Sequence, residues 1–430
     1  MKKYITAILA LIVFNSVNAQ SISLQECISR AIEANYSIKI ARNDLEIAKN
    51  NVSLAPFLPT VSLGARQLKY NYDYKTYNES GEKSKSSSDY NTLSTNATLN
   101  WTLFDGFSMF AERSRLEELL SQGELKFRAS VETLVQQISQ QFFLIISLQN
   151  QVKLFQELVA VSEERYNQAL TRYKIGKDSG LESKQAKIYL NSDSSKLIIQ
   201  QESVKNAYIK LFEMMNMPLD SKIVINDTII PEAKLEFDSL LKRALENNTS
   251  IQMVKSGQKI SDINLKLAKS ERYPVLGFSA VYNYNLTQST LYRRGYNETT
   301  GPYMGFSISL PIFSGFETNR KITNAKIEKQ NSVLEYDQFK QSLEVDLRQE
   351  YNTYVNNLLL IDFEIESKEA AYLNLDAAIE KYRIGSLSGI EFRDFQTSYL
   401  DASVRKISAL YQAKISEITL HLLAGDLFTH

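Results

Sequence analysis

Residues 276–286 read LGFSAVYNYNL, and residues 93–103 read LSTNATLNWTL. In both stretches apolar or aromatic side chains alternate with small polar ones, as in a β-strand with one apolar and one polar face. The same alternation occurs in residues 67–75 and in residues 303–310. The sequence therefore predicts four amphipathic strands, at about residues 61–76, 90–104, 274–288 and 302–313.

The composition of the strand faces bears on what surrounds the sheet. Alternation alone fits a soluble antiparallel sheet packed on a core. Aromatic apolar faces and small polar opposite faces favour a membrane β-barrel, because aromatic girdles mark lipid–water boundaries and polar residues line a lumen. The aromatic residues that we expect to face lipid are Tyr70, Tyr72, Tyr74, Trp101, Phe278, Tyr282, Tyr284 and Phe306. The hydrophilic segments 77–89 and 288–301 are expected to be long loops at the hairpin tips.

Long helices are expected after each strand pair. Residues 108–173 contain no proline and a single glycine, Gly123, and their apolar residues recur in alternating steps of four and three. This period makes helices supercoil around neighbours, and further apolar residues beside the seam indicate neighbours on both flanks. The helices by themselves also fit a soluble bundle. We expect helices at about residues 108–173, 181–215, 317–382 and 390–423.

The chain repeats itself over a long interval. Arg30–Asn35 (RAIEAN) returns as Arg243–Asn248 (RALENN) at an offset of 213, and Arg172–Gly176 (RYKIG) returns as Lys381–Gly385 (KYRIG) at an offset of 209. A period of this length indicates two copies of one large module. We therefore expect residues 20–230 to form repeat 1 and residues 231–430 to form repeat 2.

The amino terminus reads as a secretory signal. Two lysines precede an apolar run at residues 5–14 and small residues before Gln20, so we expect residues 1–19 to be a signal peptide. The only cysteine, Cys27, lies beyond the expected cleavage point, which predicts no amino-terminal lipid anchor and no internal disulfide. Lys plus Arg balances Asp plus Glu at 49 each, which argues against nucleic acid as a partner.

The number of strands predicts an assembly. Membrane barrels have about eight strands or more, and an open sheet edge in hydrocarbon leaves backbone groups unpaired at a cost of several kcal/mol each. Four strands per chain must therefore combine with strands of other subunits. Three copies would supply twelve strands, and the same symmetry would close the long helices into a ring.

These features together resemble the TolC-like outer-membrane channel family. The resemblance covers essentially the whole chain after residue 19 and rests on the duplication, on the strand ends Leu103–Gly106 (LFDG) and Ile312–Gly315 (IFSG), and on the Tyr-x-x-Gly turns at Tyr173 and Tyr382. It implies an α+β, mostly α, fold. A trimer would share a twelve-stranded membrane β-barrel, four strands from each chain, and a long α-helical coiled-coil barrel. The implied location is the outer membrane of a Gram-negative bacterium, with the helical part in the periplasm.

The resemblance also implies a function and partners. It describes the outer-membrane channel component of a tripartite efflux or type I secretion system, a passive exit duct gated at its periplasmic helical tip. The implied partners are two further copies of the chain in a homotrimer, a periplasmic adaptor (membrane fusion) protein, an inner-membrane transporter and outer-membrane lipid. The residues alone leave two alternatives, a periplasmic coiled-coil scaffold and an adhesin, each with a soluble β-sheet.

The same family assigns residues at the periplasmic tip. Adaptors are expected to dock at the helix turns, which contain Tyr173, Gly176, Gly180, Gly385 and Gly389. Glu391 and Asp394 match an acidic pair that lines the constriction. Tyr382 matches a tyrosine that hydrogen-bonds in the closed state to an acid, matched here by Glu182. Leu387 stands where a family member has a basic gate residue, so the complete closing network of the family is not expected.

Glu391 and Asp394 also have a simpler interpretation. They lie three residues apart near an expected helix start, where the amide dipoles favour acidic side chains on a solvated surface. As a ring around a threefold axis they would instead favour the passage of cations.

The residue types that carry most enzyme chemistry form no recognisable constellation. The two histidines, His421 and His430, have no metal-ligand spacing with Cys27, and no phosphate-binding glycine loop occurs. The carboxylates are scattered over helix faces, where solvated or paired charges are usual. We therefore expect no enzyme activity, no cofactor and no metal site, and the sequence does not specify the exported cargo.

Overall fold

The computed structural model describes residues 20–232, 235–289 and 295–427. The expected signal peptide, residues 1–19, lies outside the described residues. The chain forms two compact units. Unit 1 consists of the residues up to Asn43, of Leu125–Gln252 and of the residues from Gln338 onward, and unit 2 consists of Asp44–Glu124 and Met253–Asp337.

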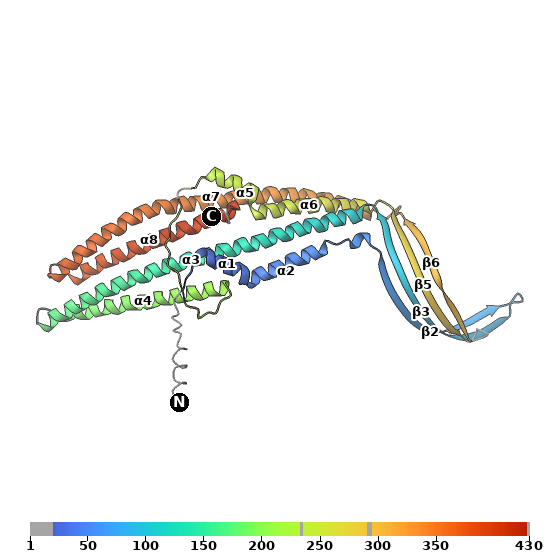
Figure 1. Cartoon of the computed structure of the whole chain (residues 1–430), viewed down its shortest axis with the longest axis horizontal. Helices are drawn as coiled ribbons and strands as arrows, with labels where there is room; N and C mark the ends of the chain where they lie inside the picture. Colours follow the sequence, from blue (N-terminus) through green and yellow to red (C-terminus); the bar gives the residue numbers. More distant parts are fainter. Residues whose placement is uncertain (1–19, 233–234, 290–294, 428–430) are drawn as a thin grey trace, which may run out of the picture. The chain divides into compact units, whose positions relative to one another are not determined.

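Unit 2 contains a four-stranded antiparallel sheet (Figure 1). Its strands, in the order in which they lie side by side, are β2 (Thr60–Tyr77), β3 (Lys83–Asp105), β5 (Val275–Ser289) and β6 (Tyr296–Ser309). β2 and β6 form the two edges, and no strand within the described residues pairs with the outer side of either. Each half of the chain therefore contributes one hairpin to a single open sheet.

The helices follow the same order in both halves of the chain. The first half has α1 (Leu24–Ala34), α2 (Tyr36–Asn51), α3 (Ser108–Lys174) and α4 (Leu181–Met214). The second half has α5 (Phe237–Asn247), α6 (Thr249–Ser270), α7 (Glu317–Arg383) and α8 (Gly389–Ala424). The short elements are η1 (Ala55–Phe57) and a parallel pair formed by β1 (Gln20–Ser21) and β4 (Ile223–Val224). Among the described helices, none has the length and apolar character needed to cross a membrane.

Local sequence signals explain where α8 begins and ends. Ser388 accepts the backbone N–H of Glu391 at its side-chain oxygen, and the Glu391 carboxylate accepts the backbone N–H of Ser388, so the two residues form a capping box. The helix ends at Gly425, which has a left-handed backbone with a φ of 74°. At the end of α4 the equivalent residue is Asn216, with a φ of 50°, and asparagine is one of the few other residues that adopt this conformation.

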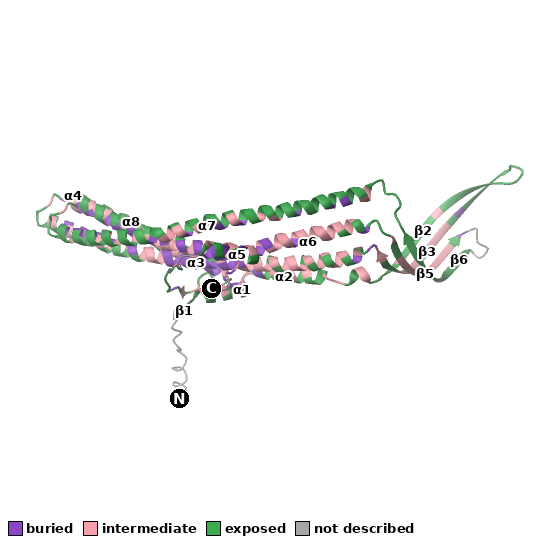
Figure 2. Ribbon diagram, turned by 90° about the horizontal axis from the view of Figure 1, so that it is seen from above, coloured by how far each residue is buried: buried purple, intermediate pink, exposed green. Residues whose placement is uncertain are grey.

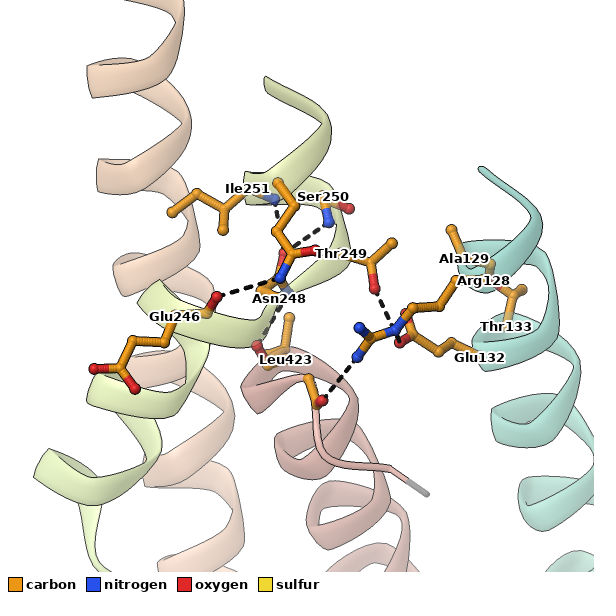
Figure 3. Close-up of polar contacts among 12 residues, drawn as sticks. Arg128, Ala129, Glu132, Thr133, Glu246, Asn248, Thr249, Ser250, Ile251 and Leu423 are labelled. Atoms are coloured by element: carbon orange, nitrogen blue, oxygen red, sulfur yellow. Dashed lines mark hydrogen bonds and ion pairs between the residues drawn. The ribbon is translucent and has the colours of Figure 1, made fainter. Parts of the chain in front are cut away.

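The duplicated RAIEAN and RALENN motifs form the same joint twice. The Asn248 carboxamide donates to the carbonyl of Leu423 at 3.0 Å and accepts two backbone N–H groups in the first turn of α6 (Figure 3). Asn35 likewise donates to the carbonyl of Met214 at 2.8 Å, near the end of α4. The two acceptor residues are 209 positions apart, which is the second offset found in the sequence. Each asparagine thus satisfies a terminal carbonyl of one helix and the start of another.

The joint at Asn248 is tied to α3 by further polar contacts (Figure 3). Arg128 pairs with Glu132 at 2.7 Å and donates to the carbonyl of Gly425 at 3.2 Å. Glu132 also accepts the hydroxyl of Thr249 at 2.9 Å. Glu132 is buried, and burying an unpaired carboxylate costs free energy. These contacts offset that cost.

The apolar core of unit 1 lies mainly on α1, α3 and α4. Ile138 and Phe142 of α3 are fully buried and belong to one cluster with Cys27 and Leu211. Burial raises the pKa of the Cys27 thiol to about 12, so this cysteine is a neutral apolar side chain. In contrast, α7 remains largely exposed in the single chain (Figure 2).

The register of the sheet corrects one prediction. Tyr70 lies opposite Tyr90, whereas Trp101 lies opposite Phe278 and Ala97 opposite Tyr282. Paired residues share a face, and successive residues alternate between faces. Tyr70, Tyr72 and Tyr74 therefore lie on one face, and the other face carries Trp101, Phe278, Tyr282, Tyr284 and Phe306. The prediction that all eight aromatic residues face lipid together is wrong.

The error comes from a change of pattern within β2. Its apolar residues are odd-numbered at Val61 and Leu63 but even-numbered from Leu68 onward, and a shift of one residue moves every side chain to the other face. The face that carries Trp101 also carries Val61 and Leu99, while the tyrosine face continues into Ser94, Asn96 and Thr98. Near Trp101 this face is apolar across the strands, from Val61 through Leu99 and Ala280 to Met304, so lipid contact stays a prediction for that face alone.

The first hairpin tip is also shorter than expected. Lys83 to Asp89, which we expected to lie in a loop, pair with Asn71 to Tyr77 and begin β3. Side-chain hydrogen bonds from Asn71 to Asp89 at 2.7 Å and from Ser87 to Asn71 at 3.0 Å support this pairing. Exposed polar residues are compatible with a strand, so hydrophilic composition alone did not locate the turn.

Candidate functional site

The two helical hairpins of unit 1 end in the same turn. In the first, Lys177 N–H donates to the carbonyl of Arg172 at 2.9 Å and Gly176 N–H donates to that of Tyr173 at 3.0 Å. The turn between α7 and α8 repeats both bonds, from Ser386 to Lys381 and from Gly385 to Tyr382. These are Schellman motifs, and Gly176 and Gly385 supply their left-handed residue with φ values of 75° and 83°.

A hydrogen bond to a buried ion pair connects the two hairpins just below these turns. Arg165 of α3 donates from Nη2 to Glu182 Oε1 at 2.9 Å, and the Tyr382 hydroxyl of α7 donates to the same oxygen at 3.0 Å. The hydrogen bond between Tyr382 and Glu182 that the family resemblance implies is therefore present. We call Arg165, Glu182 and Tyr382 the tip lock.

The arginine of the tip lock is enclosed by aromatic rings. Its side chain is 2% exposed, and its guanidinium lies 5.1 to 5.7 Å from the ring centres of Tyr189, Tyr382 and Phe392. Cation–π attraction stabilises a desolvated guanidinium by about 2 kcal/mol. The charge is thus held by one carboxylate and three rings contributed by both hairpins.

Burial and the nearby Glu182 charge raise the pKa of the Tyr382 hydroxyl, although Arg165 opposes the shift. The hydroxyl therefore stays protonated and remains a donor to Glu182 at neutral pH.

Gly389 is required for the approach of this ion pair to α8. A Cβ atom at Gly389 would lie 2.0 Å from Glu182 Oε1 and 2.5 Å from Arg165 Nη2. The backbone of Gly389 is ordinary helix, so glycine is not needed here for an unusual backbone conformation. It is needed because the ion pair lies where a side chain would be. Gly180 has both constraints, since its φ is 81° and a Cβ there would lie 2.8 Å from the ring of Tyr173.

A second buried network lies further along the same helices. Arg393 of α8 makes a two-bonded ion pair with Asp193 of α4 at 2.6 and 2.9 Å, and both side chains are at most 15% exposed. The Ser162 hydroxyl donates to Asp193 at 2.6 Å, and Gln396 donates to the oxygen of Ser162 at 2.7 Å. This network joins α3, α4 and α8, so it also links one hairpin to the other.

Arg172 adds a third link between the hairpins. Its guanidinium donates to the carbonyls of Tyr382 and Arg383 and lies 5.0 Å from the ring centre of Tyr382. These carbonyls belong to the last turn of α7, where a positive charge is favoured. Arg383 in turn pairs with Glu164 of α3 at 3.1 Å.

Comparison with known proteins identifies the family. The family model described as outer membrane efflux protein matches residues 27–217 and 240–426. The chain belongs to the outer membrane efflux protein family. TolC of Escherichia coli (strain K12) is 19% identical over 440 residues, covering 99% of this chain and 87% of the relative. TolC of Vibrio cholerae is 20% identical over 319 residues, 72% of each protein.

Solved structures of outer-membrane channels share the fold of this efflux protein. The CmeC channel of Campylobacter jejuni has a TM-score of 0.76 at 16% identity, covering 94% of this chain and 86% of that one. The open state of the MtrE channel of Neisseria gonorrhoeae has a TM-score of 0.70 at 18% identity, covering 94% and 89%. The expectation of an outer-membrane efflux channel with a TolC-like fold is confirmed.

The acidic pair of the efflux protein occupies the first turns of α8. Glu391 is exposed and accepts both the hydroxyl and the backbone N–H of Ser388, at 2.7 and 3.0 Å, and these two bonds lower its pKa. Asp394 is exposed as well. The capping box accounts for the geometry of Glu391, and a role of the pair in a constriction stays a prediction.

Leu387 packs against the apolar cluster around Tyr382 and Phe392. The position where a family member has a basic gate residue is therefore part of the apolar packing here. Polar linking of the hairpins depends instead on Tyr382, Arg172 and Arg393. Arg165 reaches the second hairpin through the rings of Tyr382 and Phe392. The sequence did not single out these three arginines. Arg393 and Asp193 are 200 positions apart, so no local pattern pairs them.

Proposed function

We propose that this efflux protein is a passive exit duct, built from three copies, that closes at the turns between its long helices. The observation that carries the proposal is the tip lock, in which a buried arginine of α3 and a tyrosine of α7 share one carboxylate of α4. Opening would separate the hairpin α7–α8 from α3–α4 and break the hydrogen bond from Tyr382 to Glu182, whereas the pair of Arg165 and Glu182 within α3–α4 would stay. A hydrogen bond to a charged group contributes about 1.5–3 kcal/mol, so the closed arrangement is favoured at rest.

Two features of the single chain support a shared assembly. The outer edges of β2 and β6 carry unpaired backbone groups in a sheet with an apolar face, and sister sheets would pair with them. The α7 helix exposes large apolar side chains such as Leu359, Phe363 and Leu373, which are 56%, 65% and 61% exposed. Stripes of this kind mark interaction surfaces, and neighbouring subunits would cover them.

Partners are proposed at the turns. Ile175 and Ile384 occupy equivalent places in the two turns and are 61% and 79% exposed, and Leu181 and Ile390 are 73% and 70% exposed. These apolar residues surround Tyr173, Gly176, Gly180, Gly385 and Gly389. We assign this surface to a periplasmic adaptor, whose binding energy would offset the cost of opening, and the adaptor would connect the duct to an inner-membrane transporter.

Single-channel recording in planar bilayers tests the gate. Glu182→Gln and Tyr382→Phe each weaken the tip lock and should raise conductance and the time spent open. Arg405→Ala is the matched control, because Arg405 pairs with Glu364 at 2.9 Å on an exposed part of the same helical hairpin. Unchanged conductance in both lock variants would contradict the gate.

The shared assembly has its own test. Native mass spectrometry of detergent-extracted protein should show a trimer, and a stable water-soluble monomer would contradict the shared barrel. For the acidic pair, the double variant Glu391→Gln with Asp394→Asn should lower cation preference if the pair lines the constriction. The helix-start interpretation instead predicts no change.

A further inference from the structure

The second repeat carries a buried polar cluster that the exit duct does not use. Glu417 and His421 lie four positions apart on α8, hence on one face, and their side chains are 4% and 6% exposed. Glu232, which precedes α5, reaches the same place, with Oε2 lying 3.8 Å from His421 Nε2. One potential ligand atom from each of the three residues lies within 4.8 Å of the other two.

Comparison of the two repeats shows that the fold does not need these polar groups. At the offset of 209, Glu417 corresponds to Tyr208 and His421 to Phe212. Phe212 belongs to the apolar core of the first repeat, and Tyr208 packs against that core while its hydroxyl accepts the backbone N–H of Ile225 at 3.0 Å. The same helix end is therefore built with two aromatic side chains in one repeat and with a carboxylate and an imidazole in the other. Helix packing alone does not account for the difference.

A third replacement places a carboxylate behind the imidazole. Asp426 corresponds to Met217 of the first repeat, and its Oδ1 lies 3.1 Å from His421 Nδ1. Asp426 is itself paired with Arg243. When Asp426 accepts the Nδ1 proton, the lone pair of Nε2 points to the side where Glu232 lies. A carboxylate that orients a histidine in this way is the usual support of a metal-binding imidazole.

Glu417 has capacity for a further partner. It pairs with Lys414, and its Oε2 accepts the backbone N–H of Glu232 at 2.8 Å. A carboxylate offers about four lone-pair sites, of which these contacts use two. A lysine also occupies the equivalent place in the first repeat, Lys205, so the lysine is not what distinguishes the second repeat.

We propose that Glu232, Glu417 and His421 bind one divalent transition-metal ion per chain. One imidazole and two carboxylates are a ligand set suited to Zn²⁺, and metal–ligand distances of about 2.0–2.2 Å would draw the three side chains closer together. An ion here would join the segment before α5 to α8. This site lies outside the tip lock and does not depend on the gate.

Calorimetric titration of the detergent-solubilised, untagged protein with Zn²⁺ tests the proposal, and Mg²⁺, which prefers all-oxygen octahedral sites, serves as the control ion. His430→Ala is the background, so that His421 is the only histidine. In that background His421→Phe installs the residue of the first repeat, and Glu232→Gln changes a side chain that is 40% exposed. Thr419→Ala, on the same helix, is the matched control.

We expect binding of one Zn²⁺ per chain in the background protein, loss of this binding with His421→Phe, and affinity at least about tenfold weaker with Glu232→Gln. Thr419→Ala should bind as the background does. Absence of Zn²⁺ binding in the background protein would overturn the proposal, and so would equal affinity in the Glu232→Gln protein. Because Glu232 is partly exposed, that variant keeps the test valid even if His421→Phe does not fold.

Discussion

The substitution Gly389→Ala tests whether the tip lock depends on close approach of α8. The added Cβ would lie 2.0 Å from Glu182 Oε1, so the carboxylate would have to move away from Arg165 and Tyr382. Hydrogen bonds to charged groups contribute about 1.5–3 kcal/mol each. The bond from Tyr382 is the one that joins the two hairpins, and losing it would shift the closed-to-open ratio by roughly 10- to 100-fold toward open, at 1.4 kcal/mol for each factor of ten.

The assay is the open probability of single channels in planar bilayers. Gly257→Ala in α6 is the control, because a Cβ at that position meets nothing within 4 Å. In the double variant Gly389→Ala with Glu182→Ala, the added methyl no longer meets the carboxylate and its close contact is with Arg165 Nη2, so its effect should be smaller than in the presence of Glu182. An open probability equal to that of the unaltered channel, or an effect of Gly389→Ala that is as large without Glu182 as with it, would refute the reasoning.

Further predictions concern stability and are measured by thermal or denaturant unfolding. Arg393→Leu leaves the buried Asp193 unpaired and should cost about 3–5 kcal/mol, whereas loss of the exposed pair in Arg320→Ala should cost at most about 1 kcal/mol; equal effects would contradict the buried network. Asn35→Ala and Asn248→Ala each orphan one helix-end carbonyl and the amides it caps, so each should cost about 1–3 kcal/mol, and a negligible cost for either would contradict the joint. Because the folded-state pKa of Glu391 is lowered, its contribution to stability should be complete above its unfolded pKa and be lost as the pH falls through the folded value. Ser388→Ala should remove this acid dependence, and an unchanged pH profile would count against the capping box.

The sequence was most informative where a periodic pattern continues over many residues. The four alternating segments predicted the amphipathic strands, and the apolar period of four and three predicted the long helices, because both patterns extend over many residues. The sequence did not predict which face of the sheet the tyrosines of β2 occupy, because alternation within one strand does not determine how that strand pairs with the next. The hydrophilic stretch at Lys83 was misjudged because polar residues can pair in an exposed strand.

At the candidate site, the sequence yielded the pair of Tyr382 and Glu182 only through family resemblance. Arg165 and Arg393 were missed because a buried arginine looks like a solvated one until its rings and carboxylate are assembled around it. Asn35 and Asn248 show the opposite case. Their motifs were visible as repeats, but the reason for the asparagine appeared only when the carbonyls of Met214 and Leu423 were placed beside it.

The unequal helix ends of the two repeats have a consequence for symmetry. Three chains with two like modules each would form a ring of six similar sectors, and the asparagine joints make all six nearly interchangeable. Phe212 in one sector and His421 in the next would break this equivalence. Both side chains are buried, so the six sectors would present matching backbones to a partner and differ in the chemistry of their interiors.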